Sequence, residues 1–302
     1  MIKIINSTLF LYIFTVIVWG STWFTIEYQL GVVPHEYSSF YRFALASLML
    51  FVYCLYKKLP LKFSLHNHLW MALLGLTLFC LNYLMVYEAQ EYLTSAMASV
   101  IFSSVLIVNI FNSWLFFRTP ISKEVLIGAL IGLVGIVLIF WKDIGDFSFE
   151  NTMLYGLAVS LLGVLAASVG NMVSFQTQKY QLPVMQMNAF AMGYGALLSL
   201  LIGLVQGKPL VYDTAPAYSI SMIYLSLFGS VLAFGAYLTL LRRIGIHKAT
   251  YVVVLFPAVA LIISTFFEGF VWTWPIAIGI LLIGIGNLFV VNRKDLTKKA
   301  IN

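Results

Sequence analysis

Few residues of this chain can do chemistry, and those few lie within long apolar stretches. Arg42 is the most costly of them, because an arginine at the centre of a membrane helix costs about 2.5 kcal/mol or more. Near a helix end, its side chain can instead extend to the lipid headgroups and pair with Glu36, Glu88 or Glu91. Alternatively, Arg42 is a fixed positive charge at the mouth of a cavity, where a guanidinium binds a carboxylate or phosphate through two hydrogen bonds. The sequence leaves both interpretations open.

Other polar and aromatic residues recur inside the apolar stretches at helical spacing. Ser95, Ser99 and Ser103 are four residues apart and therefore share one face of a helix. Each serine can simply hydrogen-bond a neighbouring helix, but the whole set predicts the walls of a shared cavity. The candidate pathway residues are Trp19, Ser21, Trp23, Arg42, Asn82, Tyr83, Tyr87, Ser99, Ser103, Asn171, Tyr237 and Tyr251.

Pro257 falls in the middle of an apolar stretch. Proline removes one helical hydrogen bond and leaves the carbonyl near Val253 without its usual donor. Broken helices near the membrane midplane often line transport sites, so Pro257 is a candidate hinge. A purely structural kink is the alternative interpretation.

The elements that must position these residues are membrane-spanning helices. The chain has 302 residues, of which 62% are hydrophobic and 9% charged, whereas a soluble domain has about 25% charged residues. A helix of about 20 apolar residues crosses the ~30 Å core of a bilayer. The sequence therefore predicts an all-α integral membrane protein. Its ten predicted spans are 8–26, 37–57, 69–87, 94–117, 123–141, 153–175, 186–206, 218–241, 249–267 and 275–291.

Charge is sorted between alternate loops of this arrangement. Fourteen of the 17 Lys and Arg residues fall on one side, and nine of the 11 acidic residues lie away from the basic loops. Because Lys and Arg favour the cytoplasmic side, we expect both termini to be cytoplasmic in a bacterial inner membrane. The first apolar stretch is longer than a signal-peptide core and lacks a small-residue cleavage site, so we expect it to be retained as a span.

A polar stretch at 142–151 divides the spans into two sets of five. Because five is odd, the second set enters the membrane from the opposite side, which indicates inverted repeats at 1–145 and 146–302. Short matches recur at offsets near 150, including Phe116-Phe117-Arg118 with Phe266-Phe267-Glu268. Gly128 and Gly135 match Gly279 and Gly286 in the same way. Chance similarity between apolar helices is the alternative. The fifth and tenth spans carry almost no polar side chains, which favours a scaffold role.

Several short motifs in order resemble the drug/metabolite transporter superfamily, and specifically its EamA branch. The residues that carry the resemblance are Trp19-Gly20-Ser21-Thr22, Tyr41-Arg42-Phe43, Thr94-Ser95-Ala96, Phe256-Pro257 and Phe267-Glu268-Gly269. The resemblance covers essentially the whole chain. The acidic Gly-Glu pair that is usual at the end of the fourth span is replaced by Phe117-Arg118, so no role is carried over to that position.

The resemblance implies a secondary transporter that works by alternating access through a central cavity, with spans five and ten outside the pathway. The family includes exporters of amino acids, so we expect an exporter or exchanger of small organic metabolites such as amino acids. Aromatic walls would stack on the solute, and Arg42 would hold its carboxylate. A membrane-embedded enzyme and a structural or signalling membrane protein without transport are the alternatives. An enzyme would need clustered His, Asp, Glu or Cys residues, which the sequence does not place together.

No Asp or Glu falls at the middle of a predicted span, and Glu27 and Glu88 come closest to the pathway. Glu88 is the candidate for coupling to protons, with passive exchange as the alternative. Cys54 and Cys80 lie inside apolar stretches and are interpreted as small core residues, not as a disulfide or metal site. The expected partners are a small-molecule substrate and the bilayer, with a monomeric chain, no nucleic acid, no metal and no cofactor. The identity of the substrate and the direction of transport stay open.

Overall fold

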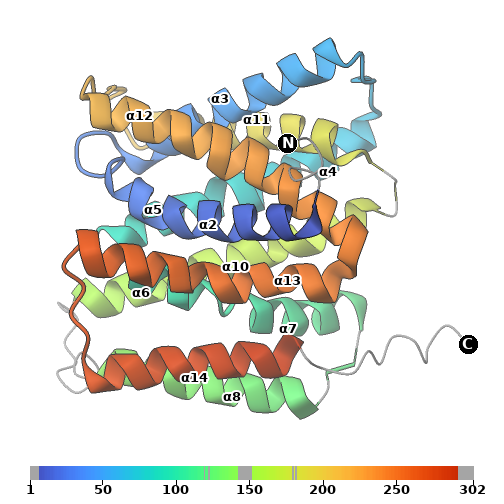
Figure 1. Ribbon diagram of the computed structural model, residues 1–302. Helices are drawn as coiled ribbons and strands as arrows, with labels where there is room; N and C mark the ends of the chain where they lie inside the picture. The colour runs from blue at the N-terminus through green and yellow to red at the C-terminus, as the bar shows by residue number, and fades with distance from the viewer. Residues whose placement is uncertain are drawn as a thin grey trace, which may run out of the picture.

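The structure is a computed structural model that describes residues 7–118, 120–121, 123–141, 152–178, 180 and 182–291, apart from the side chains of 178, 238, 241–251, 290 and 291. Every regular element in the described part is helical, and most of the helices lie roughly side by side (Figure 1). The predicted repeat boundary at 145/146 and both chain termini lie outside the described residues.

Seven helical stretches of the described chain are long and apolar enough to cross a membrane. They are α2 (Thr8–Glu27), α3 (His35–Tyr56), Leu65–Gln90, Ser95–Phe117, Thr152–Thr177 of α10 (Thr152–Gln178), α11 (Val184–Val205) and Pro216–Tyr237. Three further apolar segments complete the ten predicted spans. They are α8 (Lys123–Ile139), Val252–Phe267 and α14 (Trp274–Val291).

Helix starts follow ordinary capping rules. The Ser7 hydroxyl accepts a hydrogen bond from the backbone N–H of Phe10 at 3.0 Å, which caps α2. Thr94 accepts from the backbone N–H of Met97 at 3.3 Å and caps α6 (Ser95–Phe102). These side chains satisfy N–H groups that have no partner within the helix, so the spans begin where the sequence places a small hydroxyl residue.

The predicted fourth span, 94–117, corresponds to Ser95–Phe117, which is made of two helices joined by a turn. Helix α6 ends at Phe102, and α7 (Val105–Phe117) begins after a turn at Ser103 and Ser104. The Ser103 hydroxyl donates to the carbonyl of Val100 at 2.6 Å. Serine hydroxyls that bond nearby carbonyls compete with the helical ladder, which accounts for the break at this pair.

The third and eighth spans each contain a π-helical segment. In the third span, η1 (Gly75–Leu81) lies between α4 (Leu65–Leu74) and α5 (Asn82–Gln90). In the eighth, η2 (Leu225–Leu232) lies between α12 (Pro216–Tyr224) and α13 (Ala233–Phe267). Their first residues, Gly75 and Leu225, are 150 positions apart, the same offset as the sequence matches. Such segments are rare and occur frequently at functional sites.

A loop was predicted between spans eight and nine, but the structure has helix there. Helix α13 is assigned without interruption over Ala233–Phe267, although its ribbon turns back between its two ends (Figure 1). The intervening residues 242–250 contain no proline and one glycine, so every one of them has an N–H available for the ladder. Pro257 lies inside α13 and does not end it.

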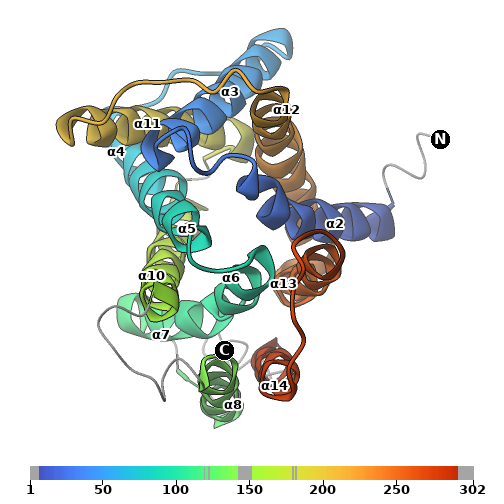
Figure 2. The same cartoon turned by 90° about the vertical axis from the view of Figure 1, so that its left-hand side faces the viewer.

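Helices α8 and α14 form a pair of their own at one edge of the bundle (Figure 2). A Cβ atom on Gly279 would lie 2.6 Å from the carbonyl oxygen of Gly135, and one on Gly286 would lie 2.5 Å from that of Gly128. The sequence matches Gly128 with Gly279 and Gly135 with Gly286, so a twofold axis converts one close approach into the other. This relation is the one expected of inverted repeats, and backbone approach at glycine is how such helices associate in lipid.

Candidate functional site

Arg42 is the centre of the polar region between the two repeats. Its side chain projects from α3 and is 1% exposed. Its Nε donates to the Ser230 hydroxyl of η2 at 3.3 Å. The guanidinium carbon lies 4.6 Å from the ring centroid of Tyr83 and 5.3 Å from that of Phe43. Arg42 is therefore buried among aromatic rings in this structure and does not reach its surface.

The guanidinium has no anionic partner among the described residues. Glu36 is paired with Lys208, and Glu88 and Glu91 are paired with His35, so the expected carboxylate partners of Arg42 are engaged elsewhere. Nη1 of Arg42 has no hydrogen-bond partner within the described part of the chain. A buried charge is costly unless it is paired and hydrogen-bonded. The arrangement therefore leaves a strong donor group without an anion from the described residues.

The π-helical segment η2 packs against Arg42. The Ser226 hydroxyl donates to the backbone carbonyl of Arg42 at 2.9 Å, and the Ser230 hydroxyl donates to the carbonyl of Leu225 at 3.1 Å. A Cβ atom on Gly229 would lie 2.8 Å from Thr22 Cγ2 and 3.4 Å from Arg42 Nη2. Gly229 therefore allows the first span, the second span and η2 to meet at one point.

Aromatic side chains from both repeats surround the guanidinium. The Trp19 indole N–H donates to the carbonyl of Gly229 at 3.2 Å, and its ring lies 5.0 Å from Tyr237 and 5.2 Å from Phe234. Tyr87 is fully buried, and its hydroxyl lies close to the Arg42 guanidinium. We call the following set the arginine cluster: Trp19, Arg42, Phe43, Tyr83, Tyr87, Ser226, Gly229, Ser230, Phe234 and Tyr237.

Five of the predicted pathway residues thus lie together in this cluster. They are Trp19, Arg42, Tyr83, Tyr87 and Tyr237. Phe43, Phe234 and the three residues from η2 were not predicted as site residues. Ser226 and Ser230 are four positions apart in an apolar stretch. The same spacing of serines marked the fourth span as a candidate pathway helix and could have marked the eighth.

Trp23 lies one turn beyond Trp19, toward the end of α2, and packs outside the cluster. Its ring centroid is 5.3 Å from that of Phe102 and 5.9 Å from that of Phe256. It therefore joins α2 to α6 and to the proline-containing part of α13. Pro257 follows Phe256 directly, so the candidate hinge lies beside an aromatic contact between the two repeats.

The predicted serines and asparagines make contacts between neighbouring helices or along their own helix. Ser21 shares a hydrogen bond of 2.7 Å with the Tyr224 hydroxyl, and Ser99 donates to the carbonyl of Ala96 at 2.7 Å. Ser103 accepts from the amide of Asn287 at 2.9 Å. These contacts fit the packing interpretation.

The two predicted asparagines also bond to nearby groups. Asn82 donates to the carbonyl of Leu78 at 3.3 Å, and its Oδ1 has no partner among the described residues. Asn171 of α10 donates to Asn109 of α7 at 3.2 Å. The side chain of Tyr251 lies outside the described residues.

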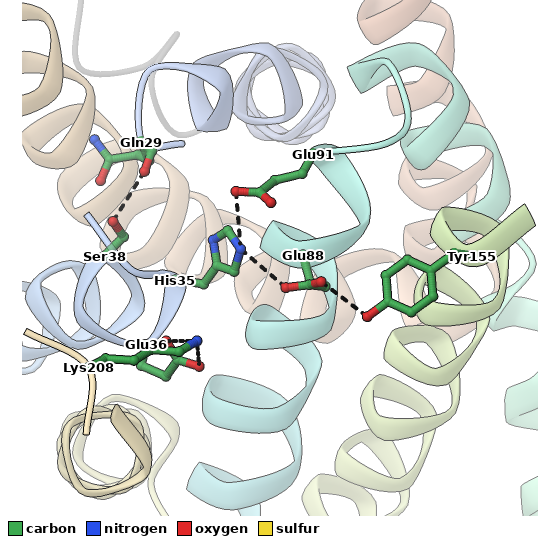
Figure 3. A network of polar contacts seen from close by, with 8 residues as sticks. All are labelled: Gln29, His35, Glu36, Ser38, Glu88, Glu91, Tyr155 and Lys208. Carbon is green, nitrogen blue, oxygen red and sulfur yellow. Dashed lines mark hydrogen bonds and ion pairs between the residues drawn. The ribbon is translucent and has the colours of Figure 1, made fainter. Parts of the chain in front are cut away.

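Glu88 lies in a polar network at one end of the molecule (Figure 3). Its carboxylate is 3.2 Å from Nε2 of His35, which also lies 3.4 Å from Glu91. The Tyr155 hydroxyl of α10 donates to Glu88 at 3.1 Å. Glu88 therefore bridges the first repeat to the second at what we call the acidic end, the end where α2 finishes and α3 begins.

A second link at the acidic end joins Glu36 to Lys208 (Figure 3). The ammonium of Lys208 donates to both carboxylate oxygens of Glu36, at 2.9 and 3.0 Å. The Tyr37 hydroxyl donates to the carbonyl of Lys208 at 2.8 Å. Since α3 is in the first repeat and Lys208 follows α11 in the second, these bonds hold the acidic end together.

Two of the grooves on the described part of the bundle contain no residue of the arginine cluster. One, of about 300 Å³, lies between α3 and α11 and is lined mainly by Phe40, Leu48 and Phe51. The other, of about 390 Å³, lies along α13 beside Trp272. Both are largely apolar. The arginine cluster itself is closed in this structure, because Arg42 and Tyr87 are buried.

Comparisons with known proteins agree with this architecture. The model of the EamA-like transporter family matches the chain twice, at residues 6–141 and 154–292. An uncharacterized transporter in the trpA 3' region of Buchnera aphidicola subsp. Schlechtendalia chinensis is 27% identical over 267 residues, covering 87% of this chain and 84% of the relative. The uncharacterized inner membrane transporter YedA of Escherichia coli K12 is 28% identical over 253 residues, covering 82% of this chain and 79% of YedA.

One solved crystal structure shares the fold at a TM-score of 0.67 and 16% sequence identity, covering 98% of this chain and 99% of that chain. The predicted fold class, an all-α membrane protein of ten spanning helices in two inverted sets of five, is confirmed. The predicted resemblance is confirmed as well. The chain belongs to the EamA-like transporter family and is a multi-pass membrane protein.

Proposed function

We propose that this protein is a secondary transporter of small organic metabolites that carry a carboxylate, such as amino acids. The solute would bind in the arginine cluster, with its carboxylate on Arg42 and its apolar part against the aromatic rings. The observation that carries the proposal is the buried guanidinium of Arg42, which has no anionic partner among the described residues.

The chemistry of the guanidinium favours a carboxylate over a neutral solute. Nη1 of Arg42 has no hydrogen-bond partner in the described part of the chain, and the fork of a guanidinium matches the two oxygens of a carboxylate. Charge-assisted bonds of this type are about twice as strong as neutral ones. An arriving carboxylate would both make those bonds and remove the cost of an unpaired buried charge.

The rings around Arg42 favour an organic solute over a small inorganic anion. Trp19, Tyr83 and Tyr237 are aromatic, and each of these residues is only partly buried. Aromatic rings stack on planar or apolar groups and add about 0.5–1.5 kcal/mol per contact. Solutes with an aromatic side chain and a carboxylate would use both features of the site.

Alternating access would give this closed site contact with each side of the membrane in turn. The arginine cluster takes residues from both repeats, so relative movement of the repeats would open it. The turn at Ser103 and Ser104 and the π-helical segments η1 and η2 provide places where the third, fourth and eighth spans can bend. The links Glu36–Lys208 and Tyr155–Glu88 would have to break for the repeats to separate at the acidic end.

We propose that the acidic end faces the outside of a bacterial inner membrane. Lys57, Lys58 and Lys62 lie at the opposite end, between α3 and α4, and basic residues favour the cytoplasmic side. The relative YedA is named an inner membrane transporter, which supports this placement. In this orientation the links Glu36–Lys208 and Tyr155–Glu88 join the two repeats on the outer side, and an exporter or exchanger would load solute from the cytoplasm.

Counterflow in proteoliposomes tests the proposal. Vesicles loaded with one unlabelled amino acid at a time would take up the same labelled amino acid, with aromatic amino acids giving the largest signal. Arg42→Lys keeps the charge and loses the fork, whereas Arg42→Gln loses both, so activity should fall in that order. If well-folded protein exchanges no carboxylate solute, or if Arg42→Gln exchanges them as wild type does, the proposal is wrong.

A further inference from the structure

A buried histidine at the acidic end lies between two carboxylates. His35 is the first residue of α3 and is 8% exposed. Its Nε2 lies 3.2 Å from the carboxylate of Glu88, in the last turn of α5, and 3.4 Å from that of Glu91, which follows this helix (Figure 3). One imidazole therefore serves two acidic side chains, and a neutral ring balances neither of their charges.

The second ring nitrogen of His35 has no partner among the described residues. An ionised carboxylate only accepts hydrogen bonds, so Nε2 carries the hydrogen that it donates to Glu88 or Glu91. A neutral imidazole has one such hydrogen, which leaves a lone pair on Nδ1, and this atom is buried. A proton that adds to Nδ1 makes the ring a cation beside two anions.

The charges around His35 favour the protonated ring. The N-terminal end of α3 opposes a cation with about half a positive charge, but the C-terminal end of α5 contributes about half a negative charge. The ammonium of Lys208 is paired with Glu36. The other ionisable side chains of neighbouring elements at this end add no positive charge, and they are Glu27 of α2, Tyr87 of α5, Tyr155 of α10 and Tyr218 of α12. The two carboxylates beside the ring therefore decide the balance.

Helices α3 and α5 connect His35 to the arginine cluster. His35 lies seven residues before Arg42, which is about two helical turns and about 10 Å along the same face of α3. On α5, the ring of Tyr83 lies 4.6 Å from the guanidinium carbon of Arg42, and the ring of Tyr87, one turn later, lies 6.4 Å from the His35 ring. A proton on His35 therefore adds a second cation near the buried guanidinium.

Charge gives these two sites a defined relation. Two cations about 10 Å apart repel each other in a protein interior, where Coulomb interactions are screened less than in water. A solute carboxylate on Arg42 cancels one of the two charges, so it favours the proton on His35. By linkage, the proton favours the carboxylate to the same extent.

We propose that His35, held between Glu88 and Glu91, binds one proton at Nδ1, and that this proton and a solute carboxylate on Arg42 bind cooperatively and are carried together. The two glutamates position the ring and balance its charge. Cooperative binding rests on the proposed function, whereas proton binding by His35 is measured without a solute.

Proton binding is measured by NMR titration of purified protein labelled at its four histidines. His35→Gln keeps a side-chain donor for the carboxylates and cannot titrate, so the signal that it removes is that of His35. In the wild type this signal should move with pH between about pH 5 and about pH 8, where histidine changes charge. His68→Gln is the matched control and should leave the signal in place, because His68 lies in α4 with its Nδ1 2.9 Å from the Tyr194 hydroxyl. If the His35 signal does not move over this range, the proton site is wrong.

Counterflow of labelled phenylalanine in proteoliposomes measures the cooperativity. The carboxylate of phenylalanine stays ionised between about pH 5.5 and about pH 8, so the change of pH leaves the anion on the solute unaltered. The wild type should need about fivefold less phenylalanine for half-saturation at the lower pH, which is the low end of coupling between sites. His35→Gln should have the same half-saturating concentration at both pH values, and His68→Gln should keep the dependence of the wild type.

Failure of the proton site and failure of the proposed function give different results. If the His35 signal moves with pH but the wild type exchanges no carboxylate solute, the proposed function fails and the proton site stands. If the wild type exchanges phenylalanine equally well at both pH values, or if His35→Gln keeps the pH dependence, cooperative binding is overturned and the proposed function stands.

Discussion

The arginine cluster and the α8–α14 pair are both interfaces between the two repeats, but they are built from opposite materials. The α8–α14 interface brings backbone against backbone at glycine, with Gly279 on Gly135 and Gly286 on Gly128. The arginine cluster brings together a buried cation, hydroxyls and aromatic rings from α2, α3, α5, η2 and α13. One interface has no room to move, and the other has polar groups that are incompletely satisfied.

This difference indicates that the α8–α14 interface is a rigid scaffold and that the arginine cluster is the interface that binds solute. Tightly packed glycine contacts leave no alternative arrangement at low cost, because protein interiors are close-packed. A donor without a partner, such as Nη1 of Arg42, lowers the free energy of the complex when a ligand binds it. We therefore expect substitutions in the cluster to change transport and substitutions in the α8–α14 pair to change stability.

The largest expected effect comes from Arg42→Gln. Truncating one side of a buried, hydrogen-bonded charge pair costs about 2 kcal/mol or more, roughly a 30-fold loss of affinity. We expect this loss for carboxylate solutes, measured as the half-saturating concentration in counterflow, with thermal stability kept or raised because a buried charge has been removed. If Arg42→Gln binds carboxylate solutes with unchanged affinity, Arg42 is not part of the solute site. The proposed difference between the two interfaces would then be wrong.

Gly279→Ala should have the next largest effect, and on stability instead of affinity. The added Cβ would lie 2.6 Å from the Gly135 carbonyl oxygen, and such overpacking costs about 1–3 kcal/mol. Gly284→Ala in the same helix is the matched control, because a Cβ there meets nothing within 4 Å. Thermal unfolding in detergent should show a lower midpoint for Gly279→Ala only. Equal midpoints for the two variants would show that the glycine contact is not a rigid scaffold.

Trp19→Phe sharpens the comparison within the cluster itself. It removes the indole hydrogen bond to Gly229 and keeps an aromatic ring, so the expected cost is about 0.5–1.5 kcal/mol. Counterflow should weaken by roughly two- to tenfold on the same scale. Trp272→Phe is the control, since that indole donates to Thr265 on an exposed surface. If both substitutions weaken exchange equally, the position of Trp19 in the cluster has no special importance.

Lys208→Gln should give the smallest effect of the four. It breaks the ion pair with Glu36, in which the lysine side chain is 38% exposed, and partly exposed pairs contribute about 1 kcal/mol or less. A two- to fivefold shift toward the outward-open form is expected, measured as modification of a cysteine placed in the cluster by a membrane-impermeant reagent. A matched change at Lys62, in the loop before α4, should leave this accessibility unchanged.

The sequence was sufficient for the fold because membrane spans leave a strong signal. Long apolar stretches, alternating loop charge and an odd number of spans per repeat predict the ten-helix arrangement with its inverted halves. The break at Ser103 and the continuity of α13 were missed, because both depend on local competition for backbone hydrogen bonds. Apolar composition alone does not report that competition.

The other part of the candidate site depends on which helices pack together, and the sequence alone does not show this. Arg42, Tyr83 and Trp19 stood out because polar or amphipathic residues inside a span need a protein partner. Ser226 and Ser230 were missed because serine also satisfies itself on its own helix. That Glu36, Glu88 and Glu91 would pair with Lys208 and His35 and leave Arg42 unpaired could only be learned from the packing of the helices.

The most direct test of a carboxylate site at Arg42 is ligand-induced stabilisation of the purified protein. Each amino acid is compared with its own amide, which keeps the side chain and lacks the anionic carboxylate. Because a ligand stabilises the state it binds, at least one amino acid should raise the unfolding temperature of the wild type, while its amide should not, and Arg42→Gln should abolish the difference. Equal stabilisation by acid and amide, or a difference that survives in Arg42→Gln, would contradict the account.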